Sequence, residues 1–391
     1  MSDTAAVPAR GFPTAEFEAR TALAQQRMAA AGLDALLLTT EPEVRYFTGF
    51  LTQFWQSPTR PWFLVVPAEG KPVAVIPTIG VDCMGRTWID DIRNWPSPQP
   101  EDDGCSLLAA ALTELAGKRG RIGIAKGKET HLRLPLGDFE QLAWRLPDAA
   151  FQDATAILRG LRMVKSAREI EKIAYVCDVV SGAFAAAPQL FAAGQSDIEV
   201  FRRFKIECLS RGVDDVSYLV GGAGQGGYGD IISPPSGRAL RQGDVLILDT
   251  GCLFDGYFCD FDRNFAIGRV DDAVRRAYEV VWRATEAGLA VARPGVSCAE
   301  LFAAMQDVLE RGGALGNDVG RMGHGLGMQL TEWPSHTPWD RTVLEAGMVL
   351  TLEPGMTFAE GKVMVHEENI VVREDGAELL TRRAAPELPV I

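Results

Sequence analysis

Positive charge is scarce in this sequence, with 39 Lys and Arg against 52 Asp and Glu in 391 residues and a formal net charge of −13. Phosphate backbones and anionic lipid surfaces bind clustered cations, so this deficit argues against nucleic-acid and membrane partners. No apolar run approaches the roughly 18 residues of a membrane-spanning helix. The first residues also lack the basic and then apolar pattern of a secretory signal. We therefore expect a cytoplasmic protein.

Cysteine and histidine are also sparse. The seven cysteines are scattered without C-x-x-C spacing, and there are only four histidines. This pattern argues against a disulfide framework and against a zinc finger. The length exceeds what one compact core usually covers, so two domains are expected.

The chain changes character near residue 155. Before it, short β-rich runs alternate with helical patterns, which is typical of an α/β domain. After it, longer helices are predicted over 166–188, 196–211, 271–293 and 298–312, around mostly antiparallel strand runs. We predict an α/β N-terminal domain over 1–157 and an α+β C-terminal domain over 158–391.

Two β-rich runs flank Asp255-Gly256, a pair that favours a tight type I′ hairpin turn. In that register Asp249 lies opposite Asp262, and Asp260 shares their face because side chains alternate along a strand. The neighbouring residues are apolar, so these carboxylates are expected to be buried. Buried like charges are costly without a compensating cation. The alternative is that Arg263 and other arginines pair with exposed acids.

Three later residues extend this set: His324 in a Gly-His-Gly segment, Glu353 at the end of an apolar strand, and Glu367 on another apolar strand. With Asp249 and Asp260 they form an oxygen-rich set with one nitrogen, which suits Mn, Fe, Co or Zn rather than a structural zinc site. Five ligands exceed the need of one ion and fit a two-metal site.

A glycine-rich segment, 221–227, matches the dinucleotide-binding pattern Gly-x-Gly-x-x-Gly. That pattern requires a helix immediately afterwards, whereas Pro234-Pro235 follows here. We therefore predict a flexible loop and no nucleotide site.

In this order the residues resemble the pita-bread superfamily of Xaa-Pro aminopeptidases, prolidases, methionine aminopeptidases and creatinase. The family has two aspartates eleven residues apart, then Gly-His-Gly, Glu-Pro-Gly and a late glutamate. The residues that match are Asp249, Asp260, His324, Glu353 and Glu367. Segments 45–50 and 161–173 resemble the family's N-terminal domain and the helix that leads into its catalytic domain. The resemblance implies a creatinase-like N-terminal domain and a pita-bread catalytic domain.

The resemblance also implies two divalent metal ions, with manganese expected and iron, cobalt or zinc as alternatives. Asp249 would hold one ion, Asp260 and Glu367 would bridge, and His324 and Glu353 would complete the second. In such a centre a bridging hydroxide attacks a polarised carbonyl while Glu353 moves a proton. Family members also imply a homodimer.

Three departures separate this chain from ordinary prolidases. Ile232 and Thr331 stand where the family has substrate-positioning histidines, and Val365 stands where it often has an arginine. A donor that stabilises an oxyanion contributes about 3–4 kcal/mol. An ordinary prolidase is therefore less expected than the fold suggests, and His336 is the candidate catalytic residue that would replace a missing histidine.

Asp262 stands where the family usually has threonine. It would be an extra ligand, a catalytic base or the partner of Arg263, and we favour the last.

Aromatic residues gather near the expected pocket loops. By analogy with family dimers, Trp55 and Arg60 are expected to reach the active site of a partner subunit, and Thr331 and Trp333 follow His324. Aromatic faces with an arginine suit a small zwitterion. The alternative is that these aromatic residues are core or dimer contacts.

The sequence thus predicts a metal-dependent hydrolase of the Xaa-Pro peptidase type that acts on a small peptide or peptide-like amide. The runner-up is a specialised small-molecule enzyme on the same fold, similar to creatinase, ectoine hydrolase or dimethylsulfoniopropionate lyase, with a zwitterionic metabolite as its substrate. An inactive binding scaffold is disfavoured, because the ligand set is intact.

Overall fold

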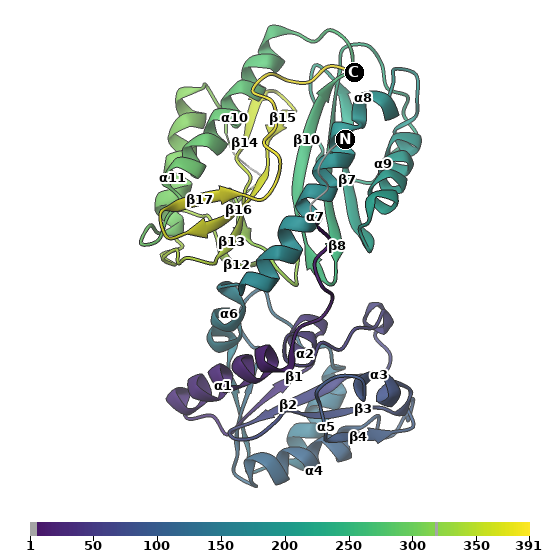
Figure 1. The fold of residues 1–391 in the computed structure, drawn as a ribbon, viewed down its shortest axis with the longest axis vertical. Helices are drawn as coiled ribbons and strands as arrows, with labels where there is room; N and C mark the ends of the chain where they lie inside the picture. Colours follow the sequence, from purple (N-terminus) through teal and green to yellow (C-terminus); the bar gives the residue numbers. More distant parts are fainter. Residues whose placement is uncertain (1–5, 317–319) are drawn as a thin grey trace. The chain divides into compact units, whose positions relative to one another are not determined.

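A computed structural model describes residues 6–316 and 320–391 and divides them into two compact units (Figure 1). One unit spans 9–162, and the other spans 163–391 together with residues 6–8. The division expected from the sequence, after residue 157, falls inside helix α6 (Thr155–Met163). In the described ranges, no helix is both long and apolar enough to cross a membrane.

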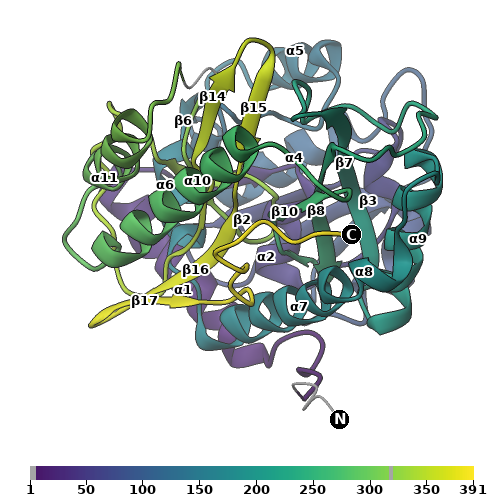
Figure 2. The same cartoon turned by 90° about the horizontal axis from the view of Figure 1, so that it is seen from above.

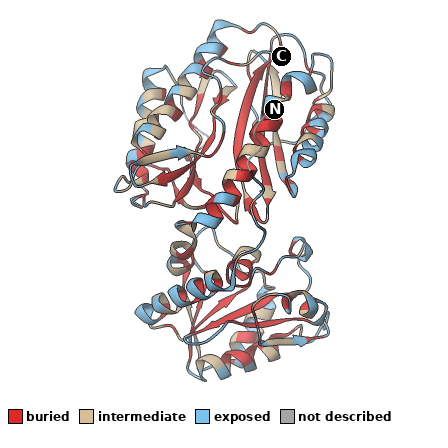
Figure 3. Cartoon of the chain, viewed as in Figure 1, coloured by how far each residue is buried: buried red, intermediate tan, exposed pale blue. Residues whose placement is uncertain are grey.

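The N-terminal unit is built on a mixed sheet with strand order β4-β3-β2-β1-β5-β6. Its strands are β1 (Ala35–Leu38), β2 (Phe63–Pro67), β3 (Val73–Pro77), β4 (Ile92–Trp95), β5 (Arg121–Ile124) and β6 (Ala150–Asp153). Its helices are α1 (Thr14–Ala31), α2 (Glu41–Thr48), α3 (Val81–Met84), α4 (Cys105–Ala116) and α5 (Leu136–Arg145), followed by α6. One face of the sheet packs against α4, and the central strands are fully buried (Figure 3).

The C-terminal unit contains two main sheets, one ordered β10-β8-β7 and the other β12-β11-β13-β16-β17. The strands are β7 (Asp215–Gln225), β8 (Asp244–Phe254), β9 (Tyr257–Phe258), β10 (Phe261–Ala266), β11 (His324–Gly325), β12 (Glu332–Ser335), β13 (Val349–Leu352), β14 (Gly355–Ala359), β15 (Lys362–Val365), β16 (Glu368–Arg373) and β17 (Gly376–Leu379). The helices are α7 (Ala167–Ala185), α8 (Ala187–Leu190), α9 (Asp197–Arg211), α10 (Asp272–Val291) and α11 (Cys298–Arg311).

Helices cover the outer faces of these sheets. α7 and α9 pack on the β7–β8 side, whereas α10 packs against β13, β14, β15 and β17, with α11 beside it. Figures 1 and 2 show the two helical layers on opposite sides of the strands. Helices α7 and α11 each begin after a serine that caps them: Ser166 and Ser297 form capping boxes with the glutamate three residues later.

The hairpin predicted around Asp255-Gly256 is confirmed. Both residues have positive φ, 46° and 77°, as a type I′ turn requires. Phe254 pairs with Tyr257, and Asp249 pairs with Asp262 across β8 and β10. Turn chemistry therefore sets which carboxylates face one another.

The prediction of a loop over 221–227 is wrong for its first part. Strand β7 continues to Gln225 and pairs with β8 through Gly221, Gly222 and Gly224. A Cβ on Gly221 would lie 2.3 Å from the Ile247 carbonyl oxygen, and its φ is +128°. Gly221 lets β7 and β8 approach closely, and residues 221–225 lie in a strand and not in a flexible loop.

Candidate metal centre and substrate pocket

Five elements bring the five predicted ligands to one cavity of about 330 Å³. Asp249 lies within β8, Asp260 immediately before β10, His324 at the start of β11, Glu353 just after β13, and Glu367 just before β16. Pairing between Gly325 and Leu350, and between Leu352 and Glu368, holds the last three together. Residues separated by more than a hundred positions thus meet at one cavity.

The geometry of this cluster suits a cation. One side-chain atom each from Asp260, His324 and Glu367 lies within 4.8 Å of the other two. His324 Nε2 is 3.3 Å from Asp260 Oδ2 and 3.8 Å from Glu353 Oε2. Glu367 Oε1 is buried and has no hydrogen-bond partner among the described residues. A buried acceptor without a donor is costly, and a metal ion in this position would satisfy it.

The orientation of His324 also fits metal binding. Its Nδ1 lies 2.9 Å from the carbonyl oxygen of Gly325, which favours the tautomer with a proton on Nδ1. Nε2 then faces the carboxylates with its lone pair. Histidines that bind metals usually donate their other ring N–H to such an oxygen.

The carboxylates disfavour one another's charge. Burial raises the pKa of Asp249 and of Glu367 well above the usual range, and neighbouring carboxylates, Asp260 foremost, add to the effect. Burial likewise raises the pKa of Glu353. Although burial alone would lower the pKa of His324, Glu353 and Asp260 raise it. Positive charge placed among these side chains would stabilise the ionised forms of the carboxylates.

Tyr218 is a site residue that the sequence analysis missed. Its hydroxyl lies 2.7 Å from Asp249 Oδ1 and also contacts Asp260 Oδ1. One hydroxyl thereby ties together the two aspartates of the hairpin. Tyr218 lies on β7, opposite Gly251, and a Cβ on Gly251 would lie 2.5 Å from the tyrosine ring. The only signal in the sequence was the small residue that leaves room for this ring.

A buried ionic network lies beside Glu367. Arg263 donates to the carbonyl oxygens of Asp262 and Glu367 and pairs with Glu368 at 2.9 Å. Arg383 pairs with the other oxygen of Glu368 at 3.0 Å. Burial opposes the charge on Glu368, but Arg263 foremost lowers the pKa of that carboxyl to about 2. The backbone that carries Glu367 is thus fixed by charge-assisted hydrogen bonds.

The interpretation of Asp262 as the partner of Arg263 stays a prediction: the charge of Arg263 lowers the pKa of the Asp262 carboxyl, against the larger raising effect of burial, but its ion pair is with Glu368. Adjacent strand residues point to opposite faces, and the guanidinium reaches the Asp262 backbone and not its carboxylate. The carboxylate is buried, and burial raises its pKa to about 7. Asp262 is not among the described residues that line the cavity, and its catalytic role stays a prediction.

The two histidines near the site are buried and neutral. Burial lowers the pKa of His336 to about 3, its Nε2 lies 3.1 Å from the Thr351 carbonyl oxygen, and it is not among the described lining residues. Its ring packs beneath Gly323, where a Cβ would lie 2.3 Å from His336 Cδ2. His366 points away from the cavity and lies 3.2 Å from Thr285 of α10. The structure thus gives His336 a packing role, and its predicted catalytic role has no support from this geometry.

Two of the three positions at which this chain departs from prolidases line the cavity. Ile232 and Thr331 are lining residues, whereas Val365 belongs to the hydrophobic core. The lining also contains Arg321, which the sequence analysis did not single out. Nothing in its local sequence distinguishes it from other arginines.

The remaining predicted substrate residues have structural contacts within their own units. Trp55 packs against Phe50 and Trp62, with ring centroids 6.4 and 5.9 Å apart. The Arg60 guanidinium lies 5.6 Å from the Phe54 ring centroid. Trp333 packs against Trp339 and donates from Nε1 to Thr342. These contacts fit the alternative that the aromatic residues are packing residues, and the substrate roles stay predictions.

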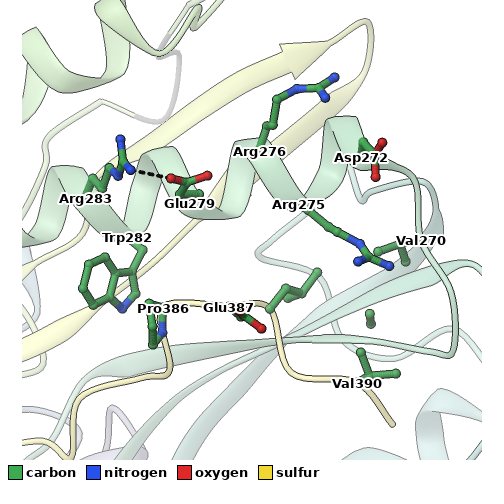
Figure 4. Close-up of a pocket in the computed structure, with 12 residues that line it drawn as sticks. Val270, Asp272, Arg275, Arg276, Glu279, Trp282, Arg283, Pro386, Glu387 and Val390 are labelled. Atoms are coloured by element: carbon green, nitrogen blue, oxygen red, sulfur yellow. Dashed lines mark ion pairs between the residues drawn. The ribbon is translucent and has the colours of Figure 1, made fainter.

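A second, larger cavity of about 740 Å³ lies between α10 and the C-terminal segment (Figure 4). Arg275, Trp282 and Glu387 line it, and an ion pair joins Glu279 and Arg283 at its edge. None of the predicted ligands lies on it. The chemistry therefore belongs to the smaller cavity.

Comparisons with known proteins identify the family of this chain. Residues 171–374 match metallopeptidase family M24, and residues 20–164 match the creatinase/prolidase N-terminal domain. Two sheets enclosed by helices, with this N-terminal domain before them, define a pita-bread metallohydrolase. The chain belongs to metallopeptidase family M24, and the predicted superfamily, fold class and enzyme class are confirmed.

The relatives carry dipeptidase names. The probable dipeptidase PepE of Mycobacterium tuberculosis is 29% identical over 373 residues, which cover 94% of this chain and 95% of that protein. The crystal structure of dipeptidase PepE from Mycobacterium ulcerans has a TM-score of 0.85 at 29% identity and covers 98% of this chain and 100% of its own. The prolidase of Thermococcus sibiricus shares the fold, with a TM-score of 0.87 at 24% identity, covering 97% of this chain and 100% of its own.

Proposed function

We propose that this chain is a dipeptidase with two divalent metal ions that hydrolyses a small peptide or peptide-like amide. The cluster of Asp260, His324 and Glu367, with the unpartnered Glu367 Oε1, carries the proposal. The dipeptidase names of relatives that match almost the whole chain support the substrate class. We further propose manganese as the metal and a homodimer as the assembly. The cytoplasmic location stays a prediction.

The proposed ligands are Asp249, Asp260, His324, Glu353 and Glu367. Bound divalent ions would acidify water and polarise the scissile carbonyl. Tyr218 orients Asp249 and Asp260, and the Gly325 carbonyl fixes the His324 ring. Glu353 keeps 21% of its side chain exposed, whereas the side chain of Asp260 keeps 4% and Glu367 is buried. It is therefore the group placed to take a proton from water and to return it to the leaving amine.

The test is turnover of Xaa-Pro and Pro-Xaa dipeptides by the manganese-loaded protein. We expect Glu353→Ala to lower kcat by at least the ~10²–10⁴-fold that proton transfer typically contributes. Glu360→Gln, at an exposed position, is the control and should keep full activity. Metal analysis should find two equivalents in the wild type and fewer in Glu367→Gln. A metal-loaded protein that cleaves no dipeptide would refute the proposal.

A second candidate is a C–N hydrolase specialised for a small zwitterionic metabolite. Ile232 and Thr331 favour it, because both line the cavity where prolidases were expected to have histidines. Turnover of such metabolites without dipeptide cleavage would select it.

A further inference from the structure

One buried ion pair involves the residue that follows Thr331 in the chain. Lys165 Nζ lies 3.1 Å from Glu332 Oε2, and only 2% and 4% of the two side chains are exposed. Lys165 lies between α6 and α7, whereas Glu332 begins β12, 167 positions later. Removing one partner of such a pair leaves an uncompensated buried charge, which is strongly unfavourable. The pair therefore holds the two segments in one arrangement.

The backbone that carries Lys165 is anchored just before β13. The N–H of Lys165 donates to the Gly347 carbonyl at 2.9 Å, and the preceding residue, Val164, forms a β-bridge with Met348. Met348 is fully buried and belongs to the hydrophobic core. The ammonium group of Lys165 is therefore presented from a backbone that has little freedom to move.

The Glu332 carboxylate organises the loop between β11 and β12. Its Oε1 accepts from the N–H of Gln329 at 3.2 Å. A Cβ on Gly327 would lie 2.8 Å from Glu332 Oε2, so the loop closes tightly around the carboxylate. The Gly327 carbonyl accepts from the N–H of Phe258 at 2.9 Å, two residues before Asp260. The loop is thus held by Glu332 at one point and by the β8–β10 hairpin at another.

This loop supplies part of the wall of the metal cavity. Leu330 and Thr331 both line the cavity, and neither is a proposed metal ligand. A Cβ on Gly251 would lie 2.6 Å from Leu330 Cδ1, so Leu330 packs against β8, the strand that also carries Asp249. A shift of the loop would therefore move the surface that faces a substrate, whereas the proposed ligands lie on other segments.

We propose that Lys165 and Glu332 are positioning residues, which act on the substrate through Leu330 and Thr331. The proposal rests on the proposed dipeptidase function. Neither Lys165 nor Glu332 is among the described residues that line the cavity, so the pair acts through the wall and not by contact. A misplacement of about 1 Å far from the chemistry can cost ~10²-fold in rate. Because the wall binds the substrate and does not take part in proton transfer, the loss is expected in KM.

The chain contains a matched control pair. Lys172 Nζ on α7 lies 2.6 Å from Asp255 Oδ2, and 1% and 11% of these side chains are exposed. Neither residue is among the described lining residues of the cavity. Lys172→Met therefore breaks a second buried lysine–carboxylate pair of the same unit, but one that does not hold the loop between β11 and β12.

The test measures kcat, KM, metal content and melting temperature for the manganese-loaded wild type, Lys165→Met and Lys172→Met, with the dipeptide that the wild type cleaves best. We expect both variants to melt at a lower temperature than the wild type. Only Lys165→Met should raise KM, by on the order of 10–100-fold, with kcat and metal content close to those of the wild type. Lys165→Arg, which keeps the charge, should have a KM between those of Lys165→Met and the wild type.

An unchanged KM in Lys165→Met would overturn the proposal. A rise in KM that Lys172→Met shares would also overturn it, because a general loss of stability would then explain the effect. If Lys165→Met does not fold, Glu332→Gln, which keeps the shape of the side chain, carries the same expectation and the same refutation. Wild-type KM in these variants leaves the dipeptidase standing, whereas a metal-loaded wild type that cleaves no dipeptide refutes the proposed function and the positioning role with it.

Discussion

The Tyr218 hydroxyl holds Asp249 and Asp260 in one arrangement. Removing a group that orients metal-binding side chains typically costs ~10–100-fold in metal affinity or activity. We expect Tyr218→Phe to have a kcat/KM lower than that of the wild type by ~10–100-fold and to bind manganese more weakly. Titration of the metal-free variant with Mn²⁺, followed by assay at saturating metal, separates the two effects.

A matched control comes from Tyr257, whose hydroxyl lies 2.9 Å from Glu169 Oε1 and which is not among the described residues that line the cavity. Tyr257→Phe should lower the free energy of unfolding by about 1–3 kcal/mol and leave kcat/KM intact. Wild-type activity and metal affinity in Tyr218→Phe would show that the bridging contact has no role.

Gly323 has a φ of +137°, and a Cβ there would lie 2.3 Å from both His336 Cδ2 and the Thr351 carbonyl oxygen. Backbone strain and overpacking should together make Gly323→Ala cost about 3 kcal/mol or more. Gly361 also has a positive φ, +63°, but open space around it, so Gly361→Ala should cost only ~1 kcal/mol. Urea denaturation of both variants measures the difference, and equal costs would contradict the proposed crowding.

At the scale of single residues the sequence indicated the proposed ligands better than their surroundings. His324, Glu353 and Glu367 stand in segments whose residue types and order are distinctive. Tyr218 and Arg321 come from a strand and a loop with no motif, and only the folded chain brings them to the cavity. Nothing in the Gly-His-Gly segment shows that the His336 ring packs against Gly323.

Strand β8 begins at an ion pair between the buried Asp244 and the half-buried Arg238. Asp244 lies 2.6 Å from Arg238 and also accepts the N–H of Arg241. Burial opposes its charge, but Arg238 and the other donors hold the pKa of this carboxyl below its usual value. We expect Arg238→Met to lower the free energy of unfolding by about 1–3 kcal/mol at pH 7.

The pH dependence of this loss follows from the direction of the shift. A carboxyl with a lowered pKa in the folded state contributes stability above its ordinary range, and that stability is lost as the pH falls. The gap between wild type and Arg238→Met should therefore narrow below about pH 4. Thermal melts from pH 7 to pH 3 check this, and a gap that stays constant over that range would exclude Asp244 as the cause.

Local turn chemistry explains why one element was predicted in detail and another was not. Asp255-Gly256 specifies its own turn, so the register of β8 and β10 followed from two residues. The glycines of β7 carry the composition of a loop but lie in a strand, because pairing with β8 leaves no room for a side chain at Gly221. A glycine-rich composition indicates only that the backbone of a segment can adopt many conformations. Pairing with a neighbouring strand then determines which conformation the segment has.

For the whole molecule we expect metal ions to contribute to stability. The cavity gathers four carboxylates of the proposed ligand set, whose charges repel without a cation. A ligand whose free concentration is one hundred times its Kd raises the free energy of unfolding by about 2.7 kcal/mol. Chelation should lower the melting temperature, and Mn²⁺ should restore it. Glu367→Gln should reduce this response and Glu360→Gln should not. A melting temperature indifferent to chelation would contradict a metal centre in the folded protein.

The roles of the aromatic residues could not be predicted from the sequence. Trp55 looked equally suited to a substrate wall and to a core, and it packs with Phe50 and Trp62 within the N-terminal unit. Large apolar side chains have similar local patterns in both roles. Which one applies depends on neighbours supplied by the rest of the unit.

The hairpin of β8 and β10 also constrains how this protein can vary over generations. Asp249 and Asp262 pair with each other across the two strands, and each lies the same number of residues from the turn at Asp255-Gly256. Adding a pair of residues to each arm would return both carboxylates to the same face, whereas a single inserted residue would turn one of them over. The two arms of the hairpin can therefore change in length only by equal, even numbers of residues if both carboxylates are to stay on this face. A single-codon insertion, which most surface loops absorb, would here turn Asp249 or Asp260 away from the cavity that both residues line.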